Sequence, residues 1–261
     1  MKKLINLMTE FGVEFFKKNK FFFPLRISSS NYPIGISYNS GTSAQLKSAV
    51  ILAGLNSYGE TKINERLKSR DHTENMLKKN KNSIKIINGK IKKIKVFGKK
   101  NLSNFSINVP GDPSSAAFFT ALTLIKKNSF LKIKNVGLNP TRLGFYSLLK
   151  KSGAKINFTN KRFVNNEQVG DITVKSSILK PLNASSKYYL NTTDEYPILF
   201  IISAFINGKS SFSGISDLKN KESDRVKEMQ KILQQIGVFS KFGKGKLIIK
   251  GKKYEQIKRS N

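Results

Sequence analysis

A pattern of helices and strands recurs three times along the chain, and it restricts the fold more than any other feature of the sequence. In each copy a short polar or acidic segment leads into an apolar helix. The leading segments are Ser43–Gln45, Ser114–Ala116 and Asp194–Glu195, and the helices that follow cover Ser48–Gly54, Phe118–Leu122 and Ile198–Ala204. Because these helices are apolar nearly all round, we expect each of them to be buried.

A short strand and then an amphipathic helix are predicted after each apolar helix. The strands are expected at 60–64, 130–134 and 210–213, and the helices near 70–79, 142–152 and 222–236. In the last helix an apolar stripe recurs at helical spacing: Val226, Met229, Ile232, Leu233 and Ile236. The pattern therefore predicts an α/β fold of βαβαββ units, one about every 70 to 80 residues. Phe11–Val13 resembles the tail of a further unit.

The composition bounds the possible functions. The net charge of +32 suggests a nucleic-acid binder, but the basic residues are 41 Lys and only 7 Arg, spread along the whole chain. We therefore expect most of this charge to be solvated surface. The chain has no Cys, which excludes disulfides and thiolate chemistry. The apolar run Pro197–Ile206 is too short to cross a bilayer and indicates a buried helix. Met1–Lys3 does not open a signal peptide, and a cytoplasmic protein is expected.

Two segments in the first half have the chemistry of an anion site. Ser43 and Gln45 stand at the start of an apolar helix, where unpaired N–H groups favour a phosphate. Ser43 is equally suited to cap that helix, and the two roles are compatible. Ser69 and Arg70 combine a hydroxyl with a guanidinium at a helix start. The two acids that follow, Asp71 and Glu74, have the spacing of a capping box. The single histidine, His72, is expected at the surface.

Two acidic segments in the second half suggest proton transfer beside an anion. Asp194 precedes an apolar helix, where it is either an N-cap or a general base. Lys221 and Arg225 are four residues apart, which places them on one face of a helix. The pair Glu222 and Arg225 has the spacing of a surface ion pair. Asp224 and Glu228 are expected on the helix surface, and Ser114–Ser115 is expected to cap its helix.

Six segments in this order resemble the enolpyruvyl transferase family, and within it the members that act on shikimate 3-phosphate. They are residues 43–49 (SAQLKSA), 69–74 (SRDHTE), 110–118 (PGDPSSAAF), 139–142 (NPTR), 194–197 (DEYP) and 221–225 (KESDR). The resemblance implies a two-lobed fold with an active site between the lobes. Residues 1–107 would be part of the N-terminal lobe, with one full unit and the end of another. Residues 108–261 would be most of the C-terminal lobe, with two units.

The family's early Lys-Ser and Gly-Thr segments and its late Arg and Lys segment have no counterpart here. The resemblance therefore implies the middle portion of an enzyme, inactive by itself. Lys219 replaces the family's usual Arg near the last motif.

The resemblance also implies roles for individual residues. Shikimate 3-phosphate would be bound by Ser43, Ala44, Gln45, Ser69, Arg70, Asp194 and Lys221, and phosphoenolpyruvate by Gln45 and Arg225. Asp194 would take the proton of the 5-hydroxyl, and Glu222 would handle the proton on the enolpyruvyl methylene carbon. The implied enzyme belongs to the shikimate pathway of aromatic amino-acid biosynthesis. It would need no metal or organic cofactor, bind small anionic substrates but no nucleic acid or membrane, and be a monomer when complete.

Two alternatives stay open at this point. The related enzyme that acts on UDP-N-acetylglucosamine typically uses a Cys, and this chain has none. A basic nucleic-acid-binding protein would need a clustered basic face with aromatic or Arg contacts, which the diffuse Lys pattern does not favour.

Overall fold

The structure is a computed structural model that describes residues 2–17, 21, 23–104, 106–221 and 223–252. The chain divides into two compact units, Met1–Ile107 and Asn108–Asn261. Each has its own buried apolar core. The two units are therefore described one at a time.

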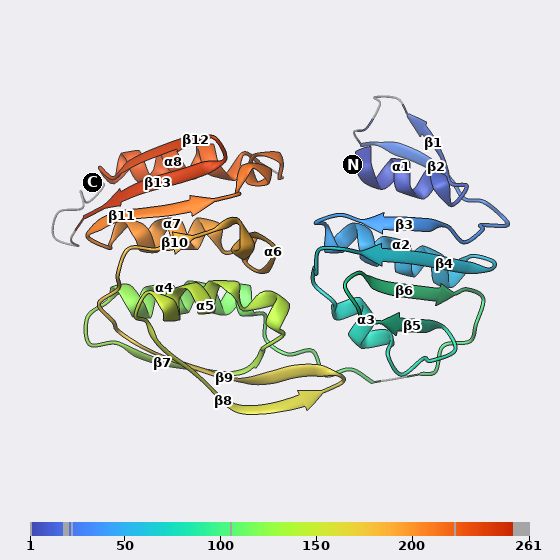
Figure 1. Ribbon diagram of the computed structural model, residues 1–261, viewed down its shortest axis with the longest axis horizontal. Coiled ribbons are helices and arrows are strands. Elements are labelled where there is room, and N and C mark those ends of the chain that lie inside the picture. The colour runs from blue at the N-terminus through green and yellow to red at the C-terminus, as the bar shows by residue number, and fades with distance from the viewer. Residues whose placement is uncertain (1, 18–20, 22, 105, 222, 253–261) are drawn as a thin grey trace. The chain divides into compact units, whose positions relative to one another are not determined.

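The first unit places α2 and α3 against a four-stranded mixed sheet, and α1 packs against α2 (Figure 1). Its sheet has the order β3-β4-β6-β5, with β3 and β4 parallel and the other neighbours antiparallel. A separate antiparallel pair, β1-β2, follows the first helix. The elements are α1 (Lys2–Glu10), β1 (Glu14–Lys17), β2 (Leu25–Ser28), β3 (Ser37–Ser40), α2 (Ala44–Asn56), β4 (Glu60–Glu65), α3 (His72–Leu77), β5 (Ile84–Ile87) and β6 (Lys92–Phe97).

The second unit contains two sheets, ordered β7-β9-β8 and β10-β11-β13-β12, with helices α4 and α7 packed against each other (Figure 1). Its first half comprises α4 (Pro113–Ile125), β7 (Phe130–Gly137), a 3-10 turn at Pro140–Arg142, α5 (Gly144–Lys151), β8 (Lys155–Val164) and β9 (Glu167–Lys175). Its second half comprises β10 (Asn183–Ala184), a 3-10 turn at Ser186–Tyr188, α6 (Tyr189–Thr192), α7 (Tyr196–Ala204), β11 (Gly208–Ser213), a 3-10 turn at Ser216–Asn220, α8 (Arg225–Gln235), β12 (Phe239–Gly243) and β13 (Lys246–Gly251).

The predicted repeat is present in the strand order of every four-stranded sheet. In the first repeat, β3 to β6, the strands stand in the order first, second, fourth, third. The third repeat, β10 to β13, has the same order and the same single parallel pair. In the second repeat the first strand is reduced to one parallel bridge between Gly111 and Val136. The βαβαββ pattern is therefore confirmed, with one strand shortened in the middle copy.

We call the helix between the first and second strands of a repeat its inner helix, and the helix between the second and third strands its outer helix. Two glycines show how closely the last strand of a repeat approaches its inner helix. A Cβ on Gly98 would lie 1.8 Å from the carbonyl oxygen of Ser57, and one on Gly251 would lie 2.1 Å from that of Ser203. The next residue in each case donates its N–H to a carbonyl at the helix end, Lys99 to Leu55 and Lys252 to Ala204. The strand thus satisfies carbonyls that the helix itself leaves unpaired.

The inner helices are not all buried as expected. In α7, Leu199, Phe200 and Ile202 are fully buried, which confirms the prediction for the third repeat. In α4, however, Phe118, Phe119 and Leu122 are 66%, 61% and 62% exposed, and Leu52 of α2 is 50% exposed. The expectation was wrong for these faces because each compact unit, as described, packs nothing against them. We call Phe118, Phe119 and Leu122 the open face of α4.

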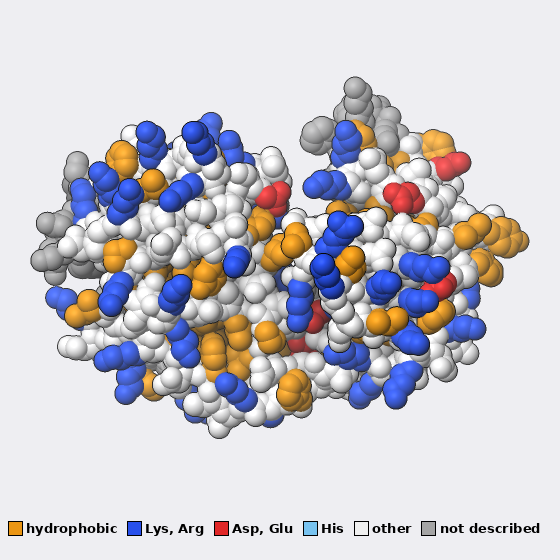
Figure 2. All heavy atoms as spheres, viewed as in Figure 1, with side chains coloured by type: hydrophobic (Ala, Val, Ile, Leu, Met, Phe, Trp, Pro, Cys, Tyr) orange, Lys and Arg blue, Asp and Glu red, His pale blue; other side chains and the backbone are white. Residues whose placement is uncertain are grey.

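The basic side chains lie on the surface. Figure 2 shows Lys and Arg scattered over the visible face of both units, with apolar and neutral surface between them. Among the Lys and Arg residues that the structure describes, Lys47 is the exception, because it is fully buried. Among the described helices, none combines the length and the hydropathy that a membrane-crossing segment needs.

Candidate active site

The start of α2 carries the first group of predicted anion-binding residues, Ser43, Ala44 and Gln45. Ser43 has extended backbone geometry and caps the helix, accepting the N–H of Leu46 at 3.3 Å through its Oγ. The capping role predicted for Ser43 is thereby confirmed. Ala44 is half-buried and Gln45 is exposed in the first turn. Gln45 is therefore the most exposed residue of this turn, while Val50 and Ile51 further along the helix lie in the core.

The Ser69–Arg70 segment lies between β4 and α3. Ser69 is buried, and both its N–H and its hydroxyl donate to Glu65 Oε1, at 3.0 and 2.7 Å. Arg70 is half-buried. The predicted capping box is wrong: Asp71 stands at the N-cap position of α3 without capping it through its side chain, and it accepts instead from Asn75 Nδ2 at 3.3 Å. His72 is exposed, as expected.

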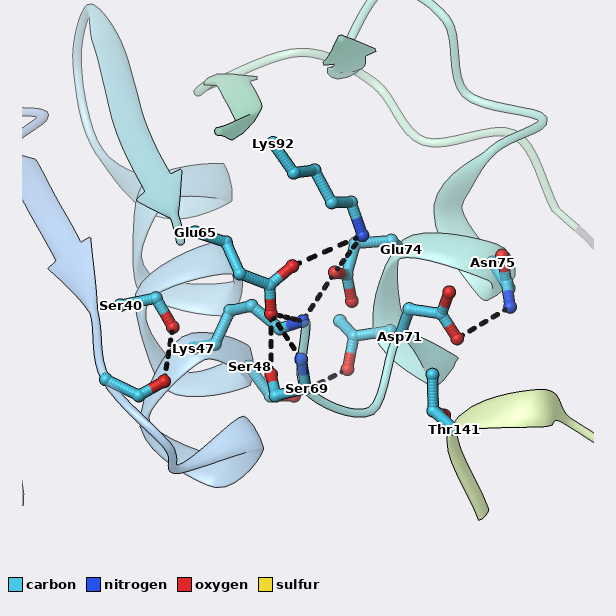
Figure 3. Close-up of polar contacts among 12 residues, drawn as sticks. Ser40, Lys47, Ser48, Glu65, Ser69, Asp71, Glu74, Asn75, Lys92 and Thr141 are labelled. Carbon is cyan, nitrogen blue, oxygen red and sulfur yellow. Dashed lines mark hydrogen bonds and ion pairs between the residues drawn. The ribbon is translucent and has the colours of Figure 1, made fainter. Parts of the chain in front are cut away.

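Glu74, the other residue of that expected box, belongs to a buried group of charges (Figure 3). Lys47 Nζ lies 2.8 Å from both Glu65 Oε1 and Glu74 Oε1. Lys92 Nζ lies 3.0 Å from Glu74 Oε1 and 3.6 Å from Glu65 Oε2. We call Lys47, Glu65, Glu74 and Lys92 the charge cluster. The sequence reasoning missed it, although Lys47 gave a signal: it is the one charged residue in an otherwise apolar helix.

The cluster changes the titration of its members. Burial opposes ionisation of Glu65, but hydrogen bonds from Lys47 and Ser69 outweigh it and hold the pKa of Glu65 below its ordinary value of 4.5. Burial likewise disfavours the charged form of Lys92, but the attraction of Glu74 and Glu65 raises its pKa above the ordinary 10.5. Glu65 and Lys92 therefore stay ionised through the neutral range.

In the second unit, Asp194 and Arg225 form an ion pair. Arg225 Nη1 lies 3.3 Å from Asp194 Oδ1 and 3.5 Å from the carbonyl oxygen of Thr193. The side chains of Asp194 and Arg225 are 38% and 22% exposed. Asp194 is not the N-cap of α7, because Glu195 occupies that position. The pair therefore joins the start of α7 to the start of α8 and remains accessible.

The start of α8 differs from the expectation. The helix begins at Arg225, with Asp224 as its N-cap accepting the N–H of Lys227 at 2.9 Å. Asp224 thus caps the helix at a position that is only partly buried. Lys221 ends a 3-10 turn and does not share a helical face with Arg225. It lies 3.3 Å from Asp217, which also accepts from Tyr189. Glu222 lies outside the described residues, and so does its expected pairing with Arg225.

Glu228 is on the surface of α8, as expected, and pairs with Lys231 at 2.9 Å. The expected cap of α4 is wrong. Asp112, not Ser114 or Ser115, caps this helix by accepting the N–H of Ser114 at 3.1 Å.

Ser114 has another role, next to the candidate base. Its hydroxyl donates to Glu195, which is 1% exposed, and accepts from Arg142. Arg142 is also paired with Asp112 at 3.0 Å. This polar group anchors the residue that follows Asp194. The sequence analysis assigned no role to Glu195, and its burial could not have been foreseen from the neighbouring Asp194 alone.

The candidate residues occupy equivalent places in the first and third repeats. Ser43 and Asp194 precede the inner helices α2 and α7, while Arg70 and Arg225 stand at the starts of the outer helices α3 and α8. In the second repeat Ser114 lies in the first turn of α4 and Arg142 precedes α5, and both contact Glu195. Among the described residues, no group of three or more His, Cys, Asp or Glu is arranged to hold a metal ion.

Comparison with known proteins identifies the family. The sequence model of EPSP synthase (3-phosphoshikimate 1-carboxyvinyltransferase) matches residues 1–261. The chain belongs to the EPSP synthase family. The resemblance to enolpyruvyl transferases and the α/β fold predicted from the sequence are both confirmed. Membership in this family does not favour either of the two alternatives.

Individual relatives agree with this assignment. A 3-phosphoshikimate 1-carboxyvinyltransferase of Petrotoga mobilis is 41% identical over 246 residues, which are 91% of this chain and 55% of the relative. The one from Zymomonas mobilis is 43% identical over 210 residues, 80% of this chain and 46% of the relative. The structure of EPSP synthase from Acinetobacter baumannii superposes with a TM-score of 0.80 at 34% identity, covering 97% of this chain and 57% of that one. The chain spans about half the length of the curated relatives it matches.

The fold also extends to a more distant enzyme. The enolpyruvyl transferase NikO from Streptomyces tendae superposes with a TM-score of 0.68 at 13% identity. At this identity the similarity concerns the fold alone.

Proposed function

We propose that this chain takes part in transferring the enolpyruvyl group of phosphoenolpyruvate to the 5-hydroxyl of shikimate 3-phosphate, with release of phosphate. The observation that carries the proposal is the accessible Asp194–Arg225 pair, in a chain of the EPSP synthase family. A carboxylate and a cation held together match a reaction that removes a hydroxyl proton beside an anionic substrate. The site is proposed to act without a metal or organic cofactor.

The second unit supplies the acid–base residues in this proposal. Asp194 takes the proton of the 5-hydroxyl as the hydroxyl oxygen bonds to C2 of phosphoenolpyruvate, and Glu222 is assigned to deliver a proton to C3. In the second step Glu222 takes a proton back from C3 as the bond from C2 to phosphate breaks and phosphate leaves. A guanidinium has five N–H donors, so Arg225 can hold Asp194 and an anion at once. Lys221 is assigned to shikimate 3-phosphate and Arg225 to phosphoenolpyruvate.

The first unit supplies anion-binding residues. Ser43, Ala44 and Gln45 are assigned to shikimate 3-phosphate, with Gln45 also contacting phosphoenolpyruvate. Support comes from the capped first turn of α2, because a helix N-terminus favours a phosphate. Ser69 and Arg70 are assigned to the same substrate. In the described geometry both Ser69 donors are directed to Glu65, so direct donation by Ser69 requires its hydroxyl to turn.

The wider expectations stay part of the proposal. Residues 1–107 are assigned to the N-terminal lobe and residues 108–261 to the C-terminal lobe. The partners are small anionic substrates, the compartment is the cytoplasm, and the complete enzyme is a monomer. The pathway is that of aromatic amino-acid biosynthesis.

Calorimetry with each ligand separately tests the division of roles. Arg225→Ala should weaken phosphoenolpyruvate binding by at least about tenfold and shikimate 3-phosphate binding by much less, because a lost charge-assisted contact is worth roughly 1.5–3 kcal/mol. Ser43→Ala should weaken shikimate 3-phosphate binding more than phosphoenolpyruvate binding. Glu228→Gln, at an exposed pair on the helix that carries Arg225, is the control. Equal losses for both ligands in both variants would contradict the assignment.

A further inference from the structure

The charge cluster joins the two anion-binding segments of the first unit. Its members come from four elements: Lys47 from α2, Glu65 from the end of β4, Glu74 from α3 and Lys92 from the start of β6 (Figure 3). The side chains of Lys47, Glu65 and Glu74 are at most 1% exposed, and that of Lys92 is 14% exposed. Two cations and two carboxylates therefore meet in the interior with no net charge.

Such a cluster is a poor source of stability. Removing charges from water costs several kcal/mol per ion, and apolar residues of similar volume often stabilise a core as well. What ion pairs add is fixed geometry, because each pair is satisfied only in one arrangement. The cluster is therefore expected to contribute through the geometry of the segments that it holds.

Glu65 holds the segment that leads to Arg70. One oxygen, Oε1, accepts both the N–H and the hydroxyl of Ser69 and also faces Lys47 at 2.8 Å. Both hydrogen-bond donors of Ser69 are thereby committed. The backbone at Ser69 is fixed to the cluster at the residue before Arg70.

Lys47 extends the same frame to the start of α2. Its side chain contacts Glu65 and Glu74, and its N–H donates to the carbonyl of Ser43 at 3.2 Å. A second link joins α2 to α3, because Ser48 and Thr73 share a hydrogen bond of 2.7 Å between their hydroxyls. These few short contacts fix the position of the turn at Ser43 relative to the segment at Ser69.

We propose that Glu65 is a positioning residue of the anion site: clamped by Lys47 and Lys92, it fixes Ser69 and so sets where Arg70 stands relative to the first turn of α2. The inference rests on the proposed function for its ligand, shikimate 3-phosphate. It gives Ser69 an indirect role, through Glu65, in addition to any contact with the phosphate.

Glu74 provides a matched control. It contacts the same two lysines, at 2.8 and 3.0 Å, and takes no part in the two hydrogen bonds from Ser69 to Glu65. Glu65→Gln and Glu74→Gln each remove one negative charge from the same cluster. Only the first weakens the acceptor of Ser69.

Hydrogen exchange in the ligand-free chain tests the positioning itself. Glu65→Gln should accelerate exchange at the amide of Ser69, and at that of Arg70, by about tenfold relative to Glu74→Gln, because the acceptor loses its charge. If Glu65→Gln folds poorly, the charge-balanced pair Lys47→Met/Glu65→Gln, which leaves one cation and one carboxylate, takes its place. Equal exchange in the Glu65 and Glu74 variants would overturn the proposal.

Binding of shikimate 3-phosphate tests the consequence. Glu65→Gln should weaken binding about tenfold and Glu74→Gln less than about threefold, since small misplacements of a binding group are costly. Ser69→Ala should weaken binding in the parent chain and add little in the Glu65→Gln background, the mark of residues acting through one another. Additive losses would mean that Ser69 acts independently of Glu65, and would overturn the proposal.

The two arms separate this inference from the proposed function. If the parent chain does not bind shikimate 3-phosphate, the proposed function fails, while hydrogen exchange still decides whether Glu65 fixes Ser69. If the ligand binds but Glu65→Gln and Glu74→Gln behave alike, the proposed function stands and the positioning role is wrong.

Discussion

Two carboxylates of this chain, Glu65 and Asp194, illustrate how surroundings assign a role. Glu65 is buried, faces two lysines and accepts both donors of Ser69. Asp194 has a side chain 38% exposed and one guanidinium at 3.3 Å. The first geometry suits a fixed structural acceptor, because its Oε1 already accepts hydrogen bonds from Lys47 and Ser69 inside the fold. The second suits a group that meets a ligand.

For Asp194 the prediction concerns turnover. Asp194→Asn should lower kcat by about 10²–10⁴, because a positioned base contributes that much and an amide cannot accept the hydroxyl proton. The affinity for shikimate 3-phosphate should change far less. Phosphate release by the active protein that carries this sequence measures kcat, with Glu228→Gln as the control. Near-normal turnover in Asp194→Asn would remove Asp194 from the proton transfer.

For the charge cluster the prediction concerns pH. The folded-state pKa of Glu65 lies below the ordinary 4.5, so its stabilisation is full above pH 4.5 and is lost as the pH falls through the folded value. The folded-state pKa of Lys92 lies above 10.5, so its stabilisation is full below pH 10.5 and is lost as the pH rises further.

The free energy of unfolding, measured with denaturant as a function of pH, tests the acid limit set by Glu65 and the alkaline limit set by Lys92. Glu65→Gln should flatten the acid side of the stability profile, whereas Glu228→Gln, at an exposed pair, should leave it unchanged. An unchanged acid side in Glu65→Gln would contradict the lowered pKa of Glu65.

At the scale of elements, the repeat in the sequence predicted the helices well and their ends less well. The core of each inner helix was found because apolar runs and polar leading segments recur. The cap at Ser43 was predicted because Ser precedes the helix directly. The start of α8 was predicted too early. A 3-10 turn at Ser216–Asn220 precedes the helix, which begins at Arg225 and does not include Lys221.

Contacts between distant segments could not be predicted from the local sequence pattern. Glu74 was expected to cap its own helix, yet its partners are Lys47 and Lys92, which come from other elements. Ser114 was expected to cap α4, yet it bonds to Glu195, 81 residues away. A window of a few residues shows what a side chain can do locally, and tertiary structure selects among those possibilities. Candidate residues at helix starts were therefore predictable, whereas the groups that hold them were not.

The open face of α4 yields a prediction at this scale. Phe119→Ser should change the free energy of unfolding by no more than about 1 kcal/mol, because the side chain is already 61% exposed. Phe200→Ala in α7 should cost about 3–5 kcal/mol, because Phe200 is fully buried. Chemical denaturation of both variants makes the comparison. A loss above 3 kcal/mol for Phe119→Ser would mean that the open face is covered in the folded chain.

At the scale of the whole molecule, the repeat explains where the candidate residues stand. Inner and outer helices of the first and third repeats begin beside Ser43, Arg70, Asp194 and Arg225. Helix starts offer unpaired N–H groups and a positive dipole end, which favour phosphates and carboxylates. A fold that repeats βαβαββ units therefore supplies several anion-binding positions of one kind. The surplus of Lys is scattered over the surface and is not needed for this account (Figure 2).

The proposed function requires that this chain bind shikimate 3-phosphate at the starts of α2 and α3. Titration of the ¹⁵N-labelled chain with that ligand, followed by amide chemical shifts, tests it most directly. The account predicts saturable shifts at Ser43, Ala44, Gln45 and Arg70, weakened by Ser43→Ala, and no shift at Glu228 on the exposed face of α8. Saturating ligand that moves none of these amides, or moves them equally in Ser43→Ala, would contradict it.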